Sequence, residues 1–364
     1  MNNCRLLPDC VVFSRNMAVT MQDIARDLNV SVVTVSKALR HQGSISTATR
    51  NRVIQRAKEL NYQMNWVARS LVTGRSYTIG LLLPDVRHPF FAEIAKAVAE
   101  TVRPQGYHVI ISYFEEDPAL EATEADSLVA RQVDGLIVAS AQSPENGLFG
   151  RIRDRKVPFV LIDRPIAGAR ASFVGADNEA IGRLATEHLI AQGCRRIAHL
   201  RGPEIGIAAA RMAGYRSALA KHKLVMPEGY IVEARYDDDM GFRAMQTLLA
   251  ADPVPDGIVC YNDPVAIGAM RAILKAGLDV PQDIAVIGAG NVLYSDLLAV
   301  PLTTVDQGTV QIGTQASEIL LQQITSKRAL RPRTVLIAPK IVIRKSTERL
   351  SSELMSTNGT GGRD

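Results

Sequence analysis

Near its N-terminus the chain has apolar residues at the three- and four-residue spacing of short helices. Thr20 followed by Asp23 has the form of a helix N-cap with an acidic N3 residue, a variant of the capping box. Ser31 and Thr47 are expected to cap two further helices. The three predicted helices span residues 21–28, 32–39 and 48 to about 62. Three short helices with a tight turn between the first two predict a helix-turn-helix.

From Thr78 onward the pattern changes to short, continuous apolar runs separated by amphipathic segments. The runs predicted as strands are 79–83, 109–112, 135–139, 159–162, 197–200, 257–260 and 284–287. Amphipathic stretches such as 91–102, 180–191, 210–220 and 264–276 predict helices between them. This alternation indicates parallel sheets covered on both faces, and about 270 residues suffice for two such lobes. Asp163 and Asp263 each follow a predicted strand, where open α/β sheets bind ligands.

The positive charge is concentrated in the predicted helical segment. The chain has 364 residues and a formal net charge of +5. Residues 18–75 contain nine Lys or Arg and three Asp or Glu, whereas residues 76–346 contain 29 and 30. A small basic unit on a neutral domain is typical of a nucleic-acid-binding module. A solvated basic helical face would give the same count, so charge alone leaves both interpretations open.

Composition and the remaining motifs exclude several protein classes. With 47% hydrophobic and 22% charged residues the chain is an ordinary globular protein. No apolar run is long enough to span a bilayer, and the first sixteen residues lack the features of a signal peptide. The cysteines and histidines have neither metal-ligand nor catalytic spacing, so we expect no catalytic residues, no metal and no cofactor. Cys194 and Cys260 are expected to be small core residues.

Several motifs in order give a specific resemblance. Residues 30–39 (VSVVTVSKAL), 49–50 (TR) and 60–62 (LNY) are followed by Asn65, Ala68 and Leu71 at three-residue intervals. In the larger part the motifs are 88–91 (HPFF), 133–137 (VDGLI), 177–178 (DN), 202–203 (GP), 211–215 (RMAGY), 262–263 (ND) and 301–305 (PLTTV). Together they resemble the lactose/galactose repressor (LacI/GalR) family of bacterial transcriptional regulators over residues 18 to about 346.

This resemblance implies a fold class and a domain organisation. The implied fold is an all-α helix-turn-helix headpiece plus an α/β core of two doubly wound parallel-sheet lobes, similar to periplasmic binding proteins. The expected segments are a disordered extension (1–17), a DNA-binding domain (18–63), a hinge helix and linker (64–76), a two-lobed effector-binding and dimerisation domain (77–346) and a flexible tail (347–364).

The headpiece residues expected to face DNA form two groups. Val32 and Val33 open the second helix, where side chains reach base edges, and can make only apolar contacts there. Core packing is the alternative for both valines. Lys37, where the family more often has arginine, would reach a guanine or a phosphate. The other candidates offer hydroxyl, amide or guanidinium donors near helix starts or a minor-groove wedge: Thr20, Ser31, Thr34, Ser46, Arg50, Tyr62, Asn65, Ala68 and Leu71.

The resemblance also places an effector between the two lobes. Phe90 and Phe91 would form apolar walls beside His88, unless both pack in the helix core. Arg211 lies in an otherwise apolar helix, where a guanidinium needs a partner. The remaining candidates are polar or aromatic residues near strand ends: Asp163, Tyr236, Asn262, Asn291 and Gln307. Asp263 is expected to cap its helix.

One departure from the family pattern concerns the effector. After the predicted strand 284–287 the family usually has Gly-Tyr/Phe-Asp, but this chain has Gly288, Ala289 and Gly290. The carboxylate that holds sugar hydroxyls is therefore replaced by Gly290, with Asn291 beside it. A missing acceptor for a hydroxyl can change specificity by roughly 10⁴-fold. A larger, less hydroxylated or more acidic ligand than a simple sugar becomes plausible.

The resemblance implies a ligand-responsive, sequence-specific repressor of a catabolic or transport operon. It would bind a pseudo-palindromic operator as a homodimer, with a sugar or sugar-derived acid as effector. It would act in the bacterial cytoplasm at the nucleoid, without a membrane partner. Two alternatives remain: an extracytoplasmic solute-binding protein, opposed by the basic headpiece, and an enzyme on an α/β core, opposed by the lack of phosphate-binding and dinucleotide motifs.

Overall fold

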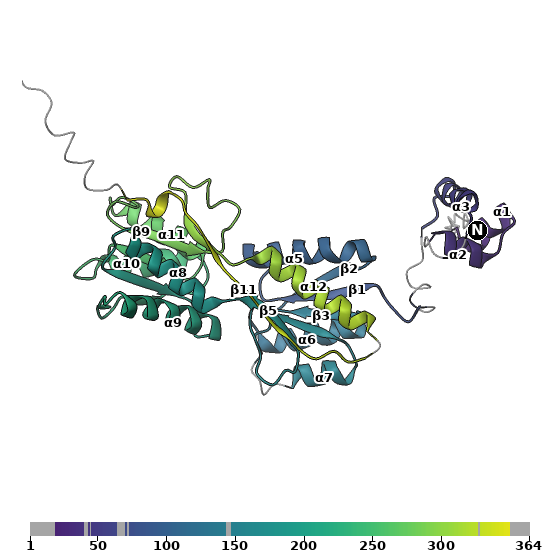
Figure 1. Cartoon of the computed structure of the whole chain (residues 1–364), viewed down its shortest axis with the longest axis horizontal. Coiled ribbons are helices and arrows are strands. Elements are labelled where there is room, and N and C mark those ends of the chain that lie inside the picture. Colours follow the sequence, from purple (N-terminus) through teal and green to yellow (C-terminus); the bar gives the residue numbers. More distant parts are fainter. Residues whose placement is uncertain are drawn as a thin grey trace, which may run out of the picture. The chain divides into compact units, whose positions relative to one another are not determined.

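The chain divides into two compact units, which are Met1–Ser76 and Tyr77–Asp364. A computed structural model describes residues 19–39, 43, 45–63, 70, 73–142, 147–326 and 328–349 (Figure 1). The predicted hinge residues Asn65, Ala68 and Leu71, the N-terminal extension and residues 350–364 lie outside the described part. Among the described helices, none is both long and apolar enough to cross a membrane.

The first unit contains three short helices, α1 (Met21–Leu28), α2 (Val32–Leu39) and α3 (Thr47–Glu59). Thr20 and Asp23 form the predicted capping box, because each accepts a hydrogen bond from the backbone N–H of the other. Ser31 Oγ accepts from the backbone of Thr34 and caps α2, as predicted. The cap of α3 is Ser46, which accepts from the N–H of Thr49, and not Thr47. The prediction was one residue late because both residues have a hydroxyl.

The interior of this unit is small and entirely apolar. Its fully buried members, from all three helices, include Ile24, Val35, Ala38 and Val53. Asn29, at the end of α1, adopts a left-handed conformation with φ 52° and sharpens the turn into α2. The three helices are thereby packed around one core in a helix-turn-helix arrangement.

The second unit contains two six-stranded sheets, and the first lobe has the order β11-β5-β4-β3-β1-β2. Its strands are β1 (Thr78–Leu83), β2 (His108–Tyr113), β3 (Gly135–Val138), β4 (Phe159–Ile162), β5 (Ser172–Ala176) and β11 (Thr334–Ile337). Its helices are α5 (Pro89–Val102), η1 (Arg103–Gln105), α6 (Pro118–Ala130), α7 (Leu148–Asp154) and α12 (Thr309–Thr325). All strand pairs in this sheet are parallel.

The second lobe has the order β12-β10-β9-β8-β6-β7. Its strands are β6 (Ile197–Arg201), β7 (Ile231–Glu233), β8 (Gly257–Cys260), β9 (Ala285–Ala289), β10 (Thr303–Asp306) and β12 (Lys340–Val342). Its helices are α8 (Asn178–Ala191), α9 (Gly206–Lys221), α10 (Asp238–Leu249), α11 (Asp263–Lys275) and η2 (Lys345–Thr347). Only β12 pairs antiparallel among the described strands, with β10.

The central strands are apolar at every position because both faces of each sheet are covered. In β1, Ile79 and Leu81 contribute to the cluster that contains α5 and α12. Leu82 contributes to the cluster on the other face, formed with α6 and α7. Alternate side chains of a strand point to opposite faces, so a strand between two helical layers needs apolar residues throughout. The predicted fold class of headpiece plus two α/β lobes is confirmed.

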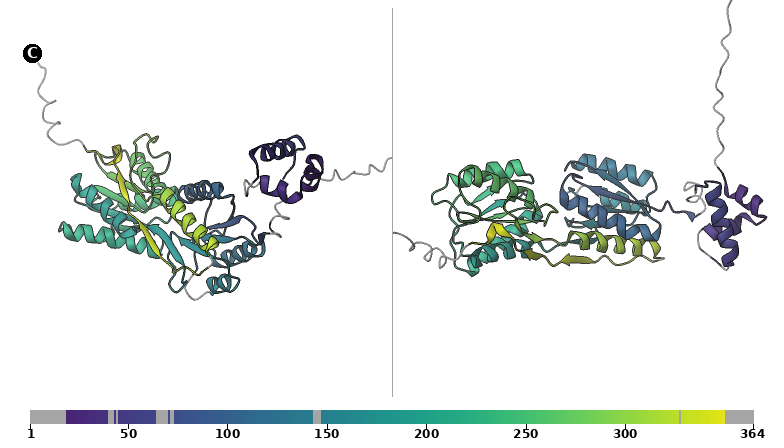
Figure 2. Two further views of the ribbon diagram at one scale, coloured as in Figure 1. Left: turned by 45° about the vertical axis from the view of Figure 1, so that its right-hand side comes forward. Right: turned by 90° about the horizontal axis from the view of Figure 1, so that it is seen from above.

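Three short segments connect the lobes, at Asp177, at 307–308 and at 338–339, along one side of the unit (Figures 1 and 2). As a result α12 and β11 belong to the first lobe although they follow the second lobe in the sequence. Opposite these connections the carboxyl ends of strands from both sheets face a common space. This arrangement forms the ligand cleft described below.

The strands that the apolar pattern missed are β5, β7, β10, β11 and β12. Three of them, β7, β11 and β12, lie at sheet edges and carry partly exposed polar residues. β5 and β10 are buried, but their sequences SFVGA and TTVD contain small or hydroxyl-bearing residues. Hydrophobicity alone does not distinguish such strands from loops.

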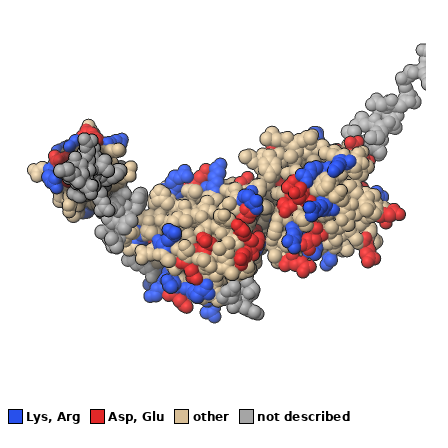
Figure 3. All heavy atoms as spheres, turned by 180° about the vertical axis from the view of Figure 1, so that it is seen from behind, with Lys and Arg blue, Asp and Glu red and all other residues tan. Residues whose placement is uncertain are grey.

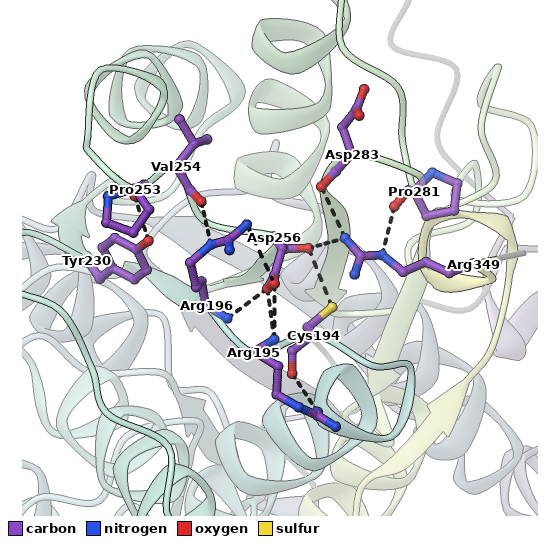
Figure 4. A network of polar contacts seen from close by, with 10 residues as sticks. All are labelled: Cys194, Arg195, Arg196, Tyr230, Pro253, Val254, Asp256, Pro281, Asp283 and Arg349. Atoms are coloured by element: carbon purple, nitrogen blue, oxygen red, sulfur yellow. Dashed lines mark hydrogen bonds and ion pairs between the residues drawn. The ribbon is translucent and has the colours of Figure 1, made fainter. Parts of the chain in front are cut away.

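The predicted flexible tail begins too early. Thr347 is fully buried and its Oγ1 lies 2.8 Å from both His188 Nε2 and Thr303 Oγ1. Arg349 donates hydrogen bonds to the backbone carbonyls of Pro281, Asp256 and Asp283 (Figure 4). Polar residues such as these resemble a tail in sequence, yet here they satisfy carbonyl groups at the end of the second lobe. Residues up to 349 therefore belong to the folded core.

Candidate functional site

A cavity of about 540 Å³ lies between the lobes, opposite their three connections. The first lobe contributes the ends of β1, β2 and β4 and the start of α5, and the second contributes α9 and the ends of β7 and β8. The lining residues are Pro84, Asp85, Val86, Arg87, His88, Phe90, Phe91, Tyr113, Glu115, Glu116, Asp163, Arg164, Arg211, Tyr236, Tyr261, Asn262 and Gln307. This volume is in the usual range for small-molecule sites.

Arg211 is the central cation of this cavity, and only 5% of it is exposed. Its Nε donates to Asn178 Oδ1 at 3.0 Å and its Nη2 to Gln307 Oε1 at 2.8 Å. Nη1 donates to the carbonyl of Tyr261, and the guanidinium carbon lies 4.7 Å from the centre of the Tyr261 ring. These acceptors are all neutral, and burial lowers the pKa of Arg211. A buried cation without a bonded carboxylate favours a ligand with acceptor or anionic groups.

Asp163 faces this cation from the opposite lobe. It follows β4 with φ 63°, a left-handed conformation that is unfavourable for a non-glycine residue. Burial raises the pKa of its carboxyl group, which the positive charges of Arg164 and Arg211 lower again. A hydroxyl or amine of a ligand between the lobes would therefore meet an acceptor on one side and a guanidinium on the other.

Arg164 and Glu116 close one edge of the cavity with a bidentate ion pair. Arg164 Nη1 and Nη2 donate to the two carboxylate oxygens of Glu116, each at 2.6 Å. Burial opposes the charge of Arg164, but the hydrogen bonds to Glu116 and the nearby Asp163 raise its pKa above the usual value. Planar two-point pairs of this kind are geometrically rigid. The pair fixes the ends of β2 and β4 relative to one another.

His88 and Asn262 shape the cavity from opposite lobes. His88 caps α5, with Nδ1 accepting from the N–H of Phe90 at 3.3 Å. Its Nε2 lies 3.3 Å from Asn262 Nδ2, which also donates to the carbonyl of Tyr236. Burial lowers the pKa of His88, so the imidazole is neutral near pH 7.

Aromatic rings form much of the remaining wall. Phe90 and Phe91 are 8% and 7% exposed and meet edge to face, with ring centroids 5.1 Å apart. Both also belong to the main hydrophobic cluster, so the two interpretations of these residues are compatible. Tyr236 and Tyr261 approach from the second lobe with centroids 6.2 Å apart. Such rings suit the apolar face of a sugar or another ring.

The first unit exposes apolar side chains at the start of α2. Val32 is 39% and Val33 61% exposed, while Val35 in the same helix is fully buried. Lys37 is exposed one turn later. The helix therefore presents two valines and a lysine outward, and its core contact uses other residues.

The other predicted DNA-facing residues lie around helix starts. The Thr20, Ser31 and Ser46 side chains act as caps, and Ser31 Oγ and Thr34 Oγ1 are 2.9 Å apart. Tyr62 packs against the small core, and Arg50 on α3 is partly exposed. Hydroxyls at exposed helix N-termini lie next to unpaired backbone N–H groups that can bind phosphate.

Comparison with known proteins identifies the family. Residues 76–345 match the family model "Periplasmic binding proteins and sugar binding domain of LacI family". Residues 20–65 match "Bacterial regulatory proteins, lacI family". The chain belongs to the LacI family. Members are ligand-responsive transcriptional repressors, so the enzyme alternative is removed, and the matched headpiece opposes the solute-binding alternative.

Relatives of this LacI-family regulator match it along most of their length. The ribose operon repressor of Halalkalibacterium halodurans is 34% identical over 331 residues, which cover 90% of this chain and 97% of that protein. The transcriptional repressor PurR of Klebsiella pneumoniae is also 34% identical over 331 residues, covering 90% and 96%. A structure of the Lac repressor dimer bound to operator and the anti-inducer ONPF has a TM-score of 0.78 at 28% identity, covering 91% and 99%.

The structure of the regulator brings most of the predicted effector residues together. His88, Phe90, Phe91, Asp163, Arg211, Tyr236, Asn262 and Gln307 all line the one cavity. Asn291 does not. Its amide donates to Asp306 Oδ2 at 3.1 Å and accepts from Arg344 Nη2 at 2.8 Å, which turns it toward a separate hollow. The prediction for Asn291 was wrong because adjacency to Gly290 did not reveal these two partners.

The roles of Asn262 and Asp263 are the reverse of those expected. Asn262 Oδ1 accepts from the N–H of Val265 and caps α11. Asp263 is fully buried and accepts from Thr304 Oγ1 at 2.5 Å and from the N–H of Val292 at 2.9 Å. Its carboxylate lies under Gly290, where a Cβ would be 3.3 Å from Asp263 Oδ2. Asp263 is thus used to hold the loop after β9.

Several lining residues were not predicted. Arg164 directly follows Asp163, and Tyr261 directly precedes Asn262, so both occupied strand ends that the sequence already marked as candidate ligand positions. Glu116 gave no such signal. It follows β2 in a left-handed conformation with φ 60°, and only the ion pair to Arg164 reveals its place.

Proposed function

We propose that this regulator is a dimeric repressor in the bacterial cytoplasm that binds a pseudo-palindromic operator and responds to a carbohydrate-related effector in the interlobe cavity. The observation that carries the proposal is Arg211, a buried guanidinium held by neutral acceptors and facing Asp163 from the other lobe. A polyhydroxylated or acidic ligand would pair with both groups. The ribose operon relative supports a sugar-related effector.

The cavity links ligand binding to a movement of the lobes. Arg211 bonds Asn178 and Gln307, which lie beside two of the three connecting segments. Asp163, His88 and the two phenylalanines belong to the opposite lobe. A ligand that contacts both walls stabilises the closed lobe arrangement more than the open one, and only such differential contact can shift a conformational equilibrium.

On the DNA side, Val32, Val33 and Lys37 are the proposed contacts of α2 with the major groove. Thr34 joins them from the same helix, and Thr20, Ser31, Ser46, Arg50 and Tyr62 are proposed to contact the sugar-phosphate backbone. Exposed valines favour apolar contact with thymine methyl groups. The net charge of +6 in residues 18–75 supports phosphate binding.

An apolar sheet edge supports the dimer. β2 is the edge strand of the first sheet, and Ile110, Ile111 and Tyr113 are 38%, 48% and 50% exposed. In the second lobe, Leu293 and Leu297 are 86% and 80% exposed. Unpaired, apolar strand edges are unfavourable in water and are usually covered. The dimeric Lac repressor structure, at a TM-score of 0.78, is consistent with covering by a second copy.

The decisive experiment measures operator binding with and without ligand. Sugars and sugar acids would first be screened by thermal shift, since a ligand at 100 times its Kd adds about 2.7 kcal/mol of stability. An operator selected in vitro would then be titrated by fluorescence anisotropy at several salt concentrations. We expect the stabilising ligand to change operator affinity, and affinity to fall steeply with salt. Ligand binding without any change in operator affinity would contradict the proposal.

Dimerisation is tested separately. Ile111→Glu places a charge on the exposed β2 edge, and we expect sedimentation equilibrium to show a weaker dimer with correspondingly weaker operator binding. Val225→Glu is the matched control, because Val225 is 84% exposed on a loop of the second lobe, away from the strand edge. Equal dimer affinity in both variants would remove β2 from the interface.

A further inference from the structure

A second hollow lies beside the effector cavity in the same cleft, with a volume of about 730 Å³. We name it the outer chamber, and the cavity around Arg211 the inner chamber. The ends of β3, β4 and β5 and the starts of α8 and α9 surround the outer chamber. Asp163 and Arg164 line both chambers. The two hollows are therefore neighbours that share one wall.

The shared wall has polar groups that the protein leaves incompletely bonded. Arg164 Nε is buried and lacks a hydrogen-bond partner among the described residues. Its nearest acidic atom there, Asp163 Oδ2, lies at 3.5 Å, which is longer than a normal N–H···O hydrogen bond. An unsatisfied buried donor is costly, by roughly 1–3 kcal/mol. A ligand oxygen at the boundary between the chambers would satisfy it.

The outer chamber has a different chemical character from the inner one. Its walls include the apolar side chains of Ile166, Phe173, Ile205, Ile207 and Leu336. No side chain caps the start of α9, where Ile205 occupies the N-cap position. Such a surface suits the faces of a flat ring and offers few partners for sugar hydroxyls.

The floor of the outer chamber is held in place by contacts within the protein. Glu121 Oε2 accepts from the N–H of Ala141 at 2.9 Å, and Gln142 Nε2 donates to the carbonyl of Pro118 at 2.6 Å. Glu121 is fully buried, and Gln142 is 4% exposed. On the opposite side Arg153 donates to the carbonyl of Ala169 at 2.6 Å and fixes the loop after β4. The hollow is thus preformed and needs no ligand to shape it.

We propose that the effector spans both chambers and is a glycoside with a ring-sized apolar substituent. The polyhydroxylated ring lies between Asp163 and Arg211 in the inner chamber, and the substituent lies among the isoleucines of the outer chamber. The glycosidic oxygen lies beside Arg164 Nε. This inference rests on the proposed function and deepens it, because it names the class of ligand. Gly290, which removes one polar partner from the sugar side, agrees with a ligand that gains affinity elsewhere.

The test compares each parent sugar with its methyl and phenyl glycosides on the full-length protein by isothermal titration calorimetry. The probes are ribose, glucose and galactose with the corresponding glycosides. For the sugar that binds, we expect the phenyl glycoside to bind at least tenfold more tightly than the methyl glycoside. A phenyl glycoside no tighter than the methyl glycoside would overturn the inference.

A chamber-filling variant locates the gain. Ala210, on α9, lines only the outer chamber, so Ala210→Phe should abolish the phenyl preference and change affinity for the parent sugar by less than about twofold. Val86→Phe is the matched control, since Val86 lines only the inner chamber, and it should weaken all three ligands together. Equal loss for sugar and phenyl glycoside in Ala210→Phe would overturn the proposal.

Two further outcomes separate this inference from the proposed function. If no parent sugar or glycoside binds, the carbohydrate assignment fails and the two-chamber proposal fails with it. If parent sugars bind and modulate operator affinity but phenyl glycosides do not bind, only the two-chamber proposal fails. Unliganded operator binding reports whether Ala210→Phe folds. Should it misfold, Leu336→Trp fills the same chamber from β11 and serves as the second variant.

Discussion

The headpiece and the two-lobed core expose and bury their functional groups in opposite ways. In the headpiece, Val32 and Val33 are 39% and 61% exposed on one short helix. In the core, Arg211 is 5% exposed and its bonded partners lie 33, 50 and 96 residues away in the sequence. The proposed DNA surface is therefore local and accessible, whereas the effector site is a buried assembly of distant strand ends.

This difference predicts two kinds of mutational effect. Changes on the exposed face of α2 should alter binding while leaving stability nearly unchanged, because those side chains make few internal contacts. Changes in the cavity should alter ligand binding and stability together, because buried polar groups lose partners. Charge supports the same contrast. Lys, Arg, Asp and Glu are interspersed over the face of the core seen in Figure 3, whose residues 76–346 are nearly neutral.

The largest effect is expected for Val33→Glu, which places a negative charge on the DNA-facing side of α2. Operator affinity should fall by roughly 100-fold through lost base contact and phosphate repulsion, with an unchanged melting temperature. Fluorescence anisotropy and thermal unfolding measure the two quantities. Val225→Glu makes the same chemical change at an exposed valine of the core and should leave operator affinity unaltered. Similar losses in both variants would show a general charge effect.

A comparable effect on the other function is expected for Arg211→Met. Loss of a buried, charged hydrogen-bond donor should weaken effector binding by roughly 10–100-fold and abolish the ligand response of operator binding. Calorimetry with the stabilising sugar and anisotropy with operator measure these changes. Arg271→Met is the control, since Arg271 is half-exposed, pairs with Asp238 and Asp239 and lies outside the cavity. Retained ligand response in Arg211→Met would refute the assigned site.

The core should also be sensitive to mild acid through His199. This side chain is 1% exposed, stacks on Tyr215, and burial lowers its pKa from 6.5 to about 4. The unfolded chain binds a proton below about pH 6.5 and the folded chain only below about 4, so stability falls as pH decreases between these values. At pH 5 the loss from His199 is about 2 kcal/mol.

Urea unfolding at pH 7.5 and pH 5 tests this dependence. His199→Phe keeps a ring against Tyr215 but removes the titrating group, and it should reduce the difference in unfolding free energy between the two pH values. His222→Phe is the control, since His222 lies at the exposed end of α9. An unchanged pH dependence in His199→Phe would assign the effect to other groups, of which buried His88 is the first candidate.

The smallest effect is expected at the position where the chain departs from its family. Gly290→Asp restores the missing carboxylate, but Gly290 has φ 147° and its Cβ would lie 3.3 Å from Asp263 Oδ2. We expect a destabilisation of about 1–3 kcal/mol from strain, with added repulsion between carboxylates, and no gain in sugar affinity. Gly290→Ala separates strain from charge in the same unfolding assay. Tighter sugar binding by Gly290→Asp would show that the position still faces the ligand.

Local features of the fold followed from the sequence. The capping box at Thr20 and Asp23 and the cap at Ser31 gave the starts of the first two helices. Seven continuous apolar runs gave the central strands, because a strand covered on both faces needs apolar residues at every position. Edge strands such as β7 and β12 escaped, since partial exposure removes that constraint.

The candidate site was predicted in its parts but not in its connections. Strand ends and family motifs pointed to Asp163, Arg211 and Asn262, and all three line one cavity. Neither pattern nor motif pointed to Glu116, whose contact with Arg164 spans 48 residues of sequence. Asn291 was misplaced because its bonds to Asp306 and Arg344 depend on how three strands of one sheet end.

The sequence by itself determined the helical headpiece, the two parallel sheets and the family, because capping, periodicity and ordered motifs act over a few residues at a time. The tertiary structure alone decided that Asp263 supports a loop while Asn262 caps, that residues 345–349 belong to the core, and that the cleft has two chambers with Arg164 between them. These features depend on strand ends separated by tens to hundreds of residues, and only folding sets the distances between them.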